Sequence, residues 1–318
     1  MIQKEEINIC FGVDDNYIQH CAATMISILS NLRSNKIIRF YLLTVALGQE
    51  NIIKIKEILK TYPNVTLEVI EIKSDVIKQF PLGKGTVSKF ITISTYLRLL
   101  IPTIFPESIN RIIYLDSDII VNDDIDNLWK FELGEKAIAG VPDNFYKQDS
   151  NKQRLNISNN YNYINAGVLL IDVSKLRMLN FTNQALNYIA KNKDKIYYHD
   201  QDVLNATCYN QITYLPYKWN MMDLYLYKKP WCQEEDKATI LTYQYKPSII
   251  HYSGRFKPWH KECENPYKNL YFKYLKGTPW EHYKPVRNEK SLNQNIKRII
   301  KRIVKGSPYI KLKKSFIW

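Results

Sequence analysis

The stretch Arg111-Ile112-Ile113-Tyr114-Leu115-Asp116-Ser117-Asp118 gives the strongest indication of the fold. Its apolar run is β-branched and aromatic, which is typical of a buried strand. Asp116 and Asp118 therefore follow the carboxyl end of a strand, where open α/β sheets bind ligands. Two aspartates one residue apart offer several oxygens to Mg²⁺ or Mn²⁺. Such pairs are also common in ordinary turns, so the motif alone leaves a metal site and a turn both open.

The segments on either side of this strand alternate between strand and helix patterns. Strands are predicted over residues 7–13, 38–43, 65–70, 137–141, 163–171 and 248–252, and helices over residues 17–32, 50–59 and 180–192. This order predicts an α/β fold, with a mostly parallel central sheet flanked by helices. We expect residues 1–283 to form one catalytic domain and residues 284–318 a basic C-terminal extension.

Composition restricts the class of protein. A chain of 318 residues that is 45% hydrophobic can bury a large core. Its five cysteines are odd in number and include no Cys-x-x-Cys pair, which argues against a disulfide framework and a structural zinc site. The first residues carry Glu5 and Glu6 where a secretion signal needs basic residues, and no window approaches 18 apolar residues. We therefore expect a cytoplasmic location.

The net charge of +14 is concentrated in the predicted extension. Residues 284–318 contain 11 Lys or Arg and one acid, so they carry +10 of that charge. Apolar residues recur at helical spacing from Leu292 to Val304, with Lys and Arg between them. A basic amphipathic helix of this kind is typical of a peripheral membrane anchor, here on the inner face of the cell membrane. Packing on the domain and binding of nucleic acid are the alternatives; we favour the anionic membrane surface and expect no nucleic-acid partner.

Five other segments concentrate polar groups that a fold alone does not require. They are the turn at residues 11–17, the stretch Ser94–Arg98, the Asn165-Ala166-Gly167 sequence, His199-Asp200-Gln201-Asp202, and residues 251–260 with His251, Gly254 and Lys257. Each has an ordinary structural reading, such as a turn or helix cap for Asp14 and Asn16. In combination with the Asp-x-Asp pair they resemble the retaining glycosyltransferases of family 8, most closely the bacterial lipooligosaccharide and lipopolysaccharide galactosyltransferases.

The resemblance runs from Ile7 to about His260 and implies a GT-A fold, a Rossmann-like arrangement, with a UDP-hexose donor. It implies roles for residues in four groups. The metal ligands are Asp116, Asp118 and His251, with Mn²⁺ as the expected ion and Mg²⁺ as the second candidate. The uridine contacts are Gly12, Asp14 and Asn16. The contacts to the donor sugar are Arg98, Asn165 and Asp200, with Ala166 beside them and Gln201 on the reacting face. The diphosphate contacts are Gly254 and Lys257.

The residue types suit sugar transfer with retention of the anomeric configuration. A divalent cation and Lys257 would stabilise the charge that develops on the departing UDP. The amide of Gln201 is a poor nucleophile compared with the carboxylates of retaining glycosidases, so we favour attack from the same face of the sugar. Asp202 is the nearest carboxylate in sequence and stays an alternative nucleophile.

The expected reaction moves galactose, or else glucose, from a UDP-sugar to a lipid-linked glycan such as a lipooligosaccharide core. A protein O-glycan is the alternative acceptor. Two hypotheses that place the chain in other classes of protein also remain. An aspartyl-phosphate phosphatase uses a similar aspartate pair but needs a hydroxyl residue where this chain has Ile120. A membrane-binding module would account for the basic extension alone and would leave the other motifs unexplained.

Overall fold

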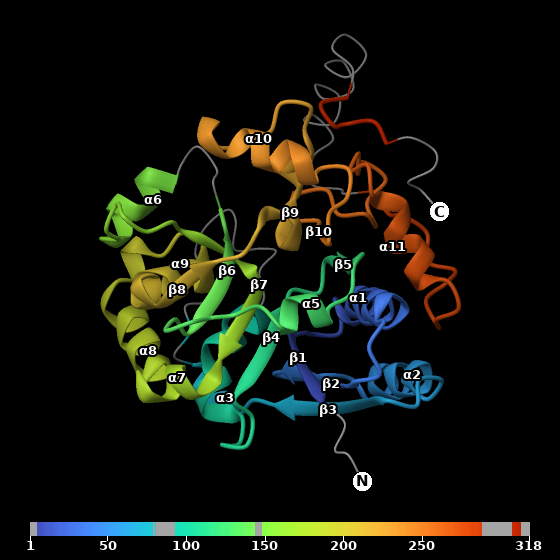
Figure 1. Ribbon diagram of the computed structural model, residues 1–318. Coiled ribbons are helices and arrows are strands. Elements are labelled where there is room, and N and C mark those ends of the chain that lie inside the picture. Colours follow the sequence, from blue (N-terminus) through green and yellow to red (C-terminus); the bar gives the residue numbers. More distant parts are fainter. Residues whose placement is uncertain (1–4, 79, 81–92, 144–147, 288–306, 313–318) are drawn as a thin grey trace.

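The computed structural model describes residues 5–78, 80, 93–143, 148–287 and 307–312. At its centre is a seven-stranded sheet in the order β3-β2-β1-β4-β7-β6-β8 (Figure 1). The strands are β1 (Glu6–Gly12), β2 (Ile37–Thr44), β3 (Val65–Glu71), β4 (Arg111–Leu115), β6 (Ile138–Pro142), β7 (Ile164–Asp172) and β8 (Ile212–Tyr214). The apolar run Arg111–Leu115 forms β4, with the predicted bounds.

The direction of the strands decides which loops meet. Strands β3, β2, β1 and β4 are parallel, whereas β7 is antiparallel to both β4 and β6. Leu115 at the end of β4 pairs with Val168 in the middle of β7, so the preceding Asn165-Ala166-Gly167 sequence lies just beyond the end of β4. The Asp116 amide donates to the Gly167 carbonyl at 2.8 Å. The predicted sheet is confirmed as mostly parallel. Strand β7 is the exception, and its antiparallel direction brings the Asn165-Ala166-Gly167 sequence to the aspartate pair.

A second, three-stranded sheet follows directly from the aspartate pair. It consists of β5 (Ile119–Val121), β10 (Ile249–His251) and β9 (Met221–Met222), with β10 in the middle. Strand β10 runs antiparallel to β5, and His251 pairs with Ile119. This pairing carries His251 across 132 positions of the sequence to Ile119, the residue after Asp118.

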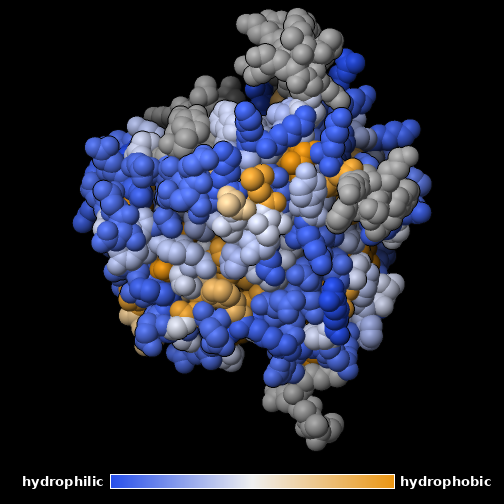
Figure 2. Space-filling model, turned by 45° about the horizontal axis from the view of Figure 1, so that its top comes forward, coloured by the Kyte–Doolittle hydropathy of each residue, from blue (hydrophilic) through white to orange (hydrophobic). Residues whose placement is uncertain are grey.

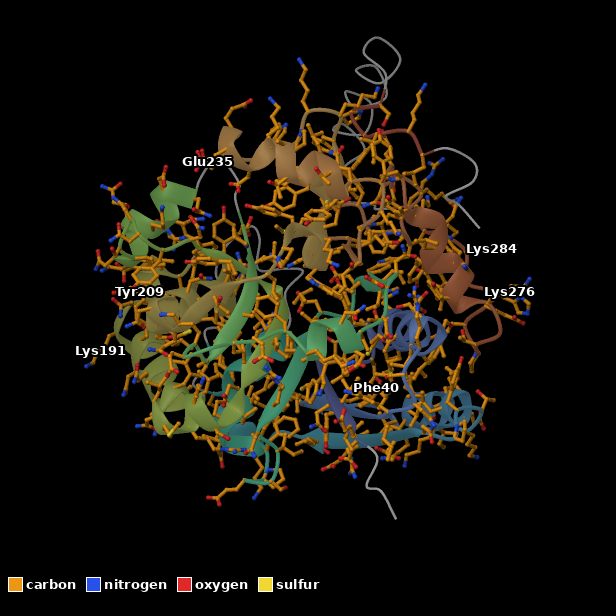
Figure 3. All side chains as sticks on the ribbon, viewed as in Figure 1. Phe40, Lys191, Tyr209, Glu235, Lys276 and Lys284 are labelled. Atoms are coloured by element: carbon orange, nitrogen blue, oxygen red, sulfur yellow. The ribbon has the colours of Figure 1, made fainter. Side chains whose placement is uncertain are left out.

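Helices cover both faces of the large sheet because successive residues of its central strands are apolar, so both faces of the sheet have to be buried. Ile7, Ile9 and Phe11 of β1 pack in one core with α1 (Ile18–Asn31), α2 (Gln49–Leu59) and α11 (Lys268–Leu275). Cys10 faces the opposite core. That core is formed with η2 (Ile93–Leu100), α4 (Ile101–Ile104), α7 (Val173–Met178), α8 (Phe181–Lys191) and α9 (His199–Cys208). Phe40 lies on β2 inside the fold, whereas Lys191 and Lys276 point outward (Figure 3).

The remaining helices are short. They are α3 (Ser74–Ile77), α5 (Asp126–Trp129), α6 (Gln148–Leu155), α10 (Glu234–Tyr243), η3 (Lys193–Lys195), η4 (Tyr209–Gln211), η5 (Tyr217–Asn220) and η6 (Asp223–Leu226). After Cys208 the chain is rich in Tyr and Pro, and it folds into short 3₁₀ turns and short strands together with the two helices α10 and α11. All five cysteines are unpaired and four are buried, which agrees with packing roles.

Hydrophilic residues dominate the face of the molecule shown in Figure 2. In the described part of the chain, no helix has the length and apolar character needed to cross a bilayer.

The structure refines the placement of two motifs. His199 begins α9, so the His199–Asp202 sequence forms the first turn of a helix rather than preceding one. Arg98 lies on a 3₁₀ helix, η2. The amphipathic helix predicted over residues 292–304 lies outside the described residues, and the domain boundary after residue 283 stays a prediction. Two short stretches of the predicted extension, residues 284–287 and 307–312, are described, and both contact the α/β fold.

Candidate functional site

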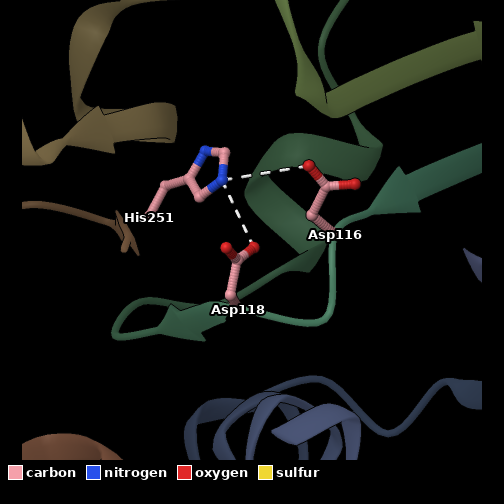
Figure 4. A group of neighbouring side chains, drawn as sticks. All are labelled: Asp116, Asp118 and His251. Carbon is pink, nitrogen blue, oxygen red and sulfur yellow. Dashed lines mark ion pairs between the residues drawn. The ribbon is translucent and has the colours of Figure 1, made fainter. Parts of the chain in front are cut away.

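Three side chains that could hold a metal ion meet at the carboxyl edge of β4. Asp116, Asp118 and His251 offer ligand atoms that all lie within 4.8 Å of one another (Figure 4). The His251 Nε2 atom lies 3.3 Å from Asp118 Oδ1 and 3.8 Å from Asp116 Oδ2. Two carboxylates and one imidazole form a mixed oxygen and nitrogen donor set, which suits Mn²⁺ better than Ca²⁺. The three predicted ligands are thus brought together, and their chemistry fits a divalent cation.

Asn220 fixes the orientation of the histidine. Its Oδ1 atom lies 2.9 Å from His251 Nδ1, and its Nδ2 donates to Asn165 Oδ1 at 2.8 Å. Because the amide nitrogen of Asn220 is used by Asn165, its oxygen faces the imidazole, and His251 Nδ1 must carry the proton. The Nε2 atom toward the aspartates then has a free lone pair, which is the form that binds a metal. Asn220 is fully buried and carries no recognisable sequence motif, and sequence reasoning missed it.

Gly167 leaves the space in which the cluster is packed. A Cβ atom on this residue would lie 2.4 Å from His251 Cε1 and 2.8 Å from Asp116 Oδ2. Both distances are far below van der Waals contact, so no larger residue fits without moving a candidate ligand. The absent side chain at Gly167 is therefore what lets two candidate ligands approach β7.

A buried cation, Arg98, and a largely buried one, Lys257, balance the aspartates. Arg98 Nη2 lies 2.8 Å from Asp116 Oδ1, and Lys257 Nζ lies 2.6 Å from Asp118 Oδ2. Burial opposes ionisation of Asp118, but the Lys257 ammonium holds the pKa of its carboxyl far below the usual range. Burial likewise works against the charged form of Lys257, whereas Asp118 raises the pKa of that ammonium. Asp118 is therefore ionised at any physiological pH, as a metal ligand must be.

Asp200 lies on the other side of Arg98. Its Oδ2 atom is 2.8 Å from Arg98 Nε, and both side chains are buried. Burial raises the pKa of Asp200 to about 6, although Arg98 acts in the opposite direction. Arg98 also donates to the Ala166 carbonyl. Arg98 therefore links the Asp116 end of the cluster to the first turn of α9 and to β7.

Gln201 is held by hydrogen bonds at both ends of its amide. Its Oε1 accepts from Asn165 Nδ2 and from the Ala166 amide, both at 3.1 Å. Its Nε2 donates to Asp143 Oδ2 at 3.0 Å. A backbone N–H can face only an acceptor, so the orientation of the amide is determined by the network. Burial raises the pKa of Asp143, a residue that follows β6 and that sequence reasoning missed.

Asp202 is placed differently from its neighbours. Its carboxylate is fully buried, pairs with Arg154 at 2.8 Å and accepts from the Tyr163 hydroxyl at 2.8 Å. It also accepts from the amides of Tyr197 and Tyr198, both at 2.7 Å. These partners occupy both oxygens, and the structure does not bring Asp202 into the aspartate and histidine cluster.

The predicted uridine contacts lie at the end of β1. Asp14 Oδ1 accepts from the Asn16 amide at 2.9 Å, which is an Asx turn. A Cβ atom on Gly12 would lie 2.3 Å from the Ser94 carbonyl oxygen, so this position admits only glycine at the present backbone spacing. Both features have a structural cause of their own. Because β1 pairs in parallel with β4, the turn lies at the same edge of the sheet as the aspartate pair.

Asp223 holds the loop that carries the last two predicted residues. Its Oδ2 accepts from the Gly254 amide at 2.6 Å, and its Oδ1 accepts from Asn265 at 2.8 Å. Burial raises the pKa of Asp223. Lys257, three residues after Gly254, also donates to the Tyr252 carbonyl at 2.6 Å. Asp223 is a third residue without a sequence motif that supports the site.

A Rossmann-like sheet with this aspartate pair after β4 is the GT-A fold of glycosyltransferases. The family model for glycosyl transferase family 8 matches residues 8–263, and the chain belongs to that family. This excludes the phosphatase reading, and the position in question, Ile120, is a buried residue of β5.

Known relatives agree with this assignment. General stress protein A of Bacillus subtilis is 29% identical over 289 residues, covering 88% of this chain and 96% of that protein. The lipopolysaccharide 1,2-glucosyltransferase of Escherichia coli is 26% identical over 283 residues, with 88% and 81% covered. The solved galactosyltransferase LgtC, in complex with donor and acceptor sugar analogues, is 25% identical with a TM-score of 0.75, and the match covers 86% of this chain and 96% of that one.

Proposed function

We propose that this glycosyltransferase moves a hexose from a UDP-sugar to a saccharide on a lipid-linked glycan, with retention at the anomeric carbon. Galactose is the favoured sugar and glucose the second candidate. Similarity to a lipopolysaccharide glucosyltransferase and to the galactosyltransferase LgtC supports this donor and acceptor class. The observation that carries the proposal is the cluster of Asp116, Asp118 and His251 with Lys257 on its rim.

The cluster would hold Mn²⁺, or Mg²⁺, next to the donor diphosphate. A divalent cation there supplies positive charge to the departing UDP. Lys257 contributes a second positive charge from the protein, and the buried setting strengthens its effect. Lys257 donates to Asp118 and to the Tyr252 carbonyl, and we expect its third N–H to serve the diphosphate.

Gln201 acts by position rather than as a nucleophile. Both lone pairs of its carbonyl oxygen are used by Asn165 and the Ala166 amide, and an amide is a weak nucleophile in any case. The fixed amide would line the reacting face of the sugar and hold it in position, and the acceptor would attack from the side that UDP leaves. We assign Asp202 to holding α9 through Arg154, since its oxygens are already occupied.

The remaining predicted contacts complete the donor site. Arg98, Asp200 and Asn165 would contact the sugar, with Ala166 holding Arg98 and Gln201 through its backbone. Gly12, Asp14 and Asn16 would contact uridine, and Gly254 would lie against the diphosphate. The basic extension would hold the enzyme at the anionic inner surface of the cell membrane, near a lipid-linked acceptor.

A donor screen tests this function. Purified full-length protein with Mn²⁺ is given UDP-galactose, UDP-glucose and other UDP-sugars, and UDP release is measured with and without chelator. We expect one UDP-hexose to be consumed, chelator to stop the reaction, and the product linkage to keep the donor's α configuration by NMR. Full turnover in excess chelator, or an inverted linkage, would contradict the proposal.

The membrane role needs a separate experiment. Replacing Lys297, Arg298, Lys301, Arg302 and Lys305 by Ser removes five positive charges without shortening the chain. Binding to vesicles with anionic lipid should fall and should lose its dependence on salt. Unchanged binding by the substituted protein would exclude this segment as the anchor.

A further inference from the structure

The segment Ser307–Leu312 returns to the α/β fold near the end of the chain. It is drawn in red in Figure 1, and it pairs with the stretch after η6. The Lys228 amide donates to the Pro308 carbonyl at 2.8 Å, and the Ile310 amide donates to the Leu226 carbonyl at 3.0 Å. These bonds flank an antiparallel bridge between Tyr227 and Tyr309.

Side chains of this segment pack into the main core. Ile310 is only 6% exposed and belongs to the same core as β1 and α1. Tyr309 and Leu312 pack against that core, and the Tyr309 ring meets the Tyr227 ring edge to face at 4.7 Å. The segment is therefore a component of the fold, although it lies within the extension that sequence alone assigned to the membrane.

Tyr309 also reaches the candidate donor site through one carboxylate. Its hydroxyl donates to Asp223 Oδ1 at 3.3 Å. The other oxygen of Asp223 accepts from the Gly254 amide at 2.6 Å, and Asp223 is almost fully buried. The Tyr309 phenol is thus two hydrogen bonds from the loop that carries Lys257.

We propose that Tyr309 is a positioning residue for the donor site, because through Asp223 it fixes the loop Ser253–Lys257 that places the Lys257 ammonium beside the diphosphate. This inference rests on the proposed function for the role of Lys257. If Asp223 loses the hydrogen bond from the Tyr309 hydroxyl, its buried carboxylate shortens the remaining hydrogen bonds or admits a water molecule. Either change displaces Gly254. The docked segment thereby ties the C-terminal extension to the affinity for donor.

The test measures UDP and UMP binding to the full-length chain with Mn²⁺ by calorimetry. Tyr309→Phe removes only the hydroxyl, and Ile310→Ala weakens the docking by a different route. We expect both substitutions to weaken UDP binding by about tenfold, because that factor corresponds to the loss of one hydrogen bond to a charged group. UMP binding should stay unchanged. Lys311→Ala, an exposed residue of the same segment, and Tyr62→Phe, a phenol on another part of the fold, serve as matched controls.

Amide hydrogen exchange separates this inference from the proposed function. Exchange of the peptide that covers residues 253–257 should be faster in Tyr309→Phe than in the wild type and in both controls. If exchange accelerates but the wild type binds no UDP, the contact stands and the proposed function fails. If the wild type binds UDP and Tyr309→Phe binds it equally well, or if UDP and UMP binding fall together, the positioning role is refuted.

Discussion

Replacing Gly167 by Ala should disable the candidate metal site without removing a ligand. The added methyl carbon would lie 2.4 Å from His251 Cε1, where ordinary contact begins near 3.4 Å, so the ring or the strand must shift by about 1 Å. The backbone of β7 is tied to β4 by the bond from the Asp116 amide to the Gly167 carbonyl, so relief by moving the strand would also displace Asp116.

The size of the effect follows from that displacement. A shift of about 1 Å in a reacting group costs about 100-fold in rate, and disturbing the support of a metal ligand costs about 10- to 100-fold in metal affinity. The same overpacking should lower the free energy of unfolding by about 1–3 kcal/mol. Mn²⁺ affinity by calorimetry, UDP-hexose turnover and urea unfolding measure the three consequences separately.

Gly140→Ala is the matched control on the neighbouring strand β6. Its methyl carbon would lie 2.4 Å from Ile164 Cδ1, the end of a flexible apolar side chain. The control should lose comparable stability and keep its Mn²⁺ affinity. If Gly167→Ala binds Mn²⁺ as tightly as the wild type, or if the control loses affinity equally, the geometry argued for the cluster is refuted.

Three further substitutions test other parts of the structure. Asn220→Ala should weaken Mn²⁺ binding about 10- to 100-fold because the imidazole loses its orienting acceptor; unaltered affinity would contradict this role. Asp202→Asn should cost roughly 3–5 kcal/mol of stability while the folded fraction keeps its turnover, and a folded but inactive protein would restore Asp202 as nucleophile. Burial lowers the pKa of His20 to about 3, so the neutral imidazole makes its full contribution to the free energy of unfolding above pH 6.5. That free energy should fall by about 2 kcal/mol between pH 7 and pH 5 as the unfolded chain takes up a proton. His20→Gln should flatten this part of the pH profile measured by urea unfolding, and an unchanged slope would refute the role of His20.

Much of the fold follows from local pattern. The run at residues 111–115 is a strand with the predicted bounds, and the alternation of strands and helices before it indicated the parallel half of the sheet. Periodicity reports which residues face a core, and it is a local property. It does not report strand direction, and the antiparallel placement of β7 could not be predicted from it.

The supporting residues were beyond sequence reasoning for a different reason. Asn220, Asp143 and Asp223 are single polar residues in irregular stretches, with no spacing that distinguishes them from turn residues. Their roles depend on partners far away in the chain, such as His251, Gln201 and Gly254. The interpretation of the extension was incomplete in the same way, since Ile310 lies within the predicted basic extension and is in fact a core residue.

Local patterns in the chain were enough to indicate the residue types of the candidate site and the buried strand before the Asp-x-Asp pair, and the motifs in combination indicated the family. Tertiary structure alone decided the assembly: β10 pairs with β5 and carries His251 to Asp118, and Gly167 leaves room for both. The physical reason is that strand and helix patterns arise from neighbours in the chain, whereas ligand geometry, burial and pKa arise from groups that only long-range packing brings within a few ångströms.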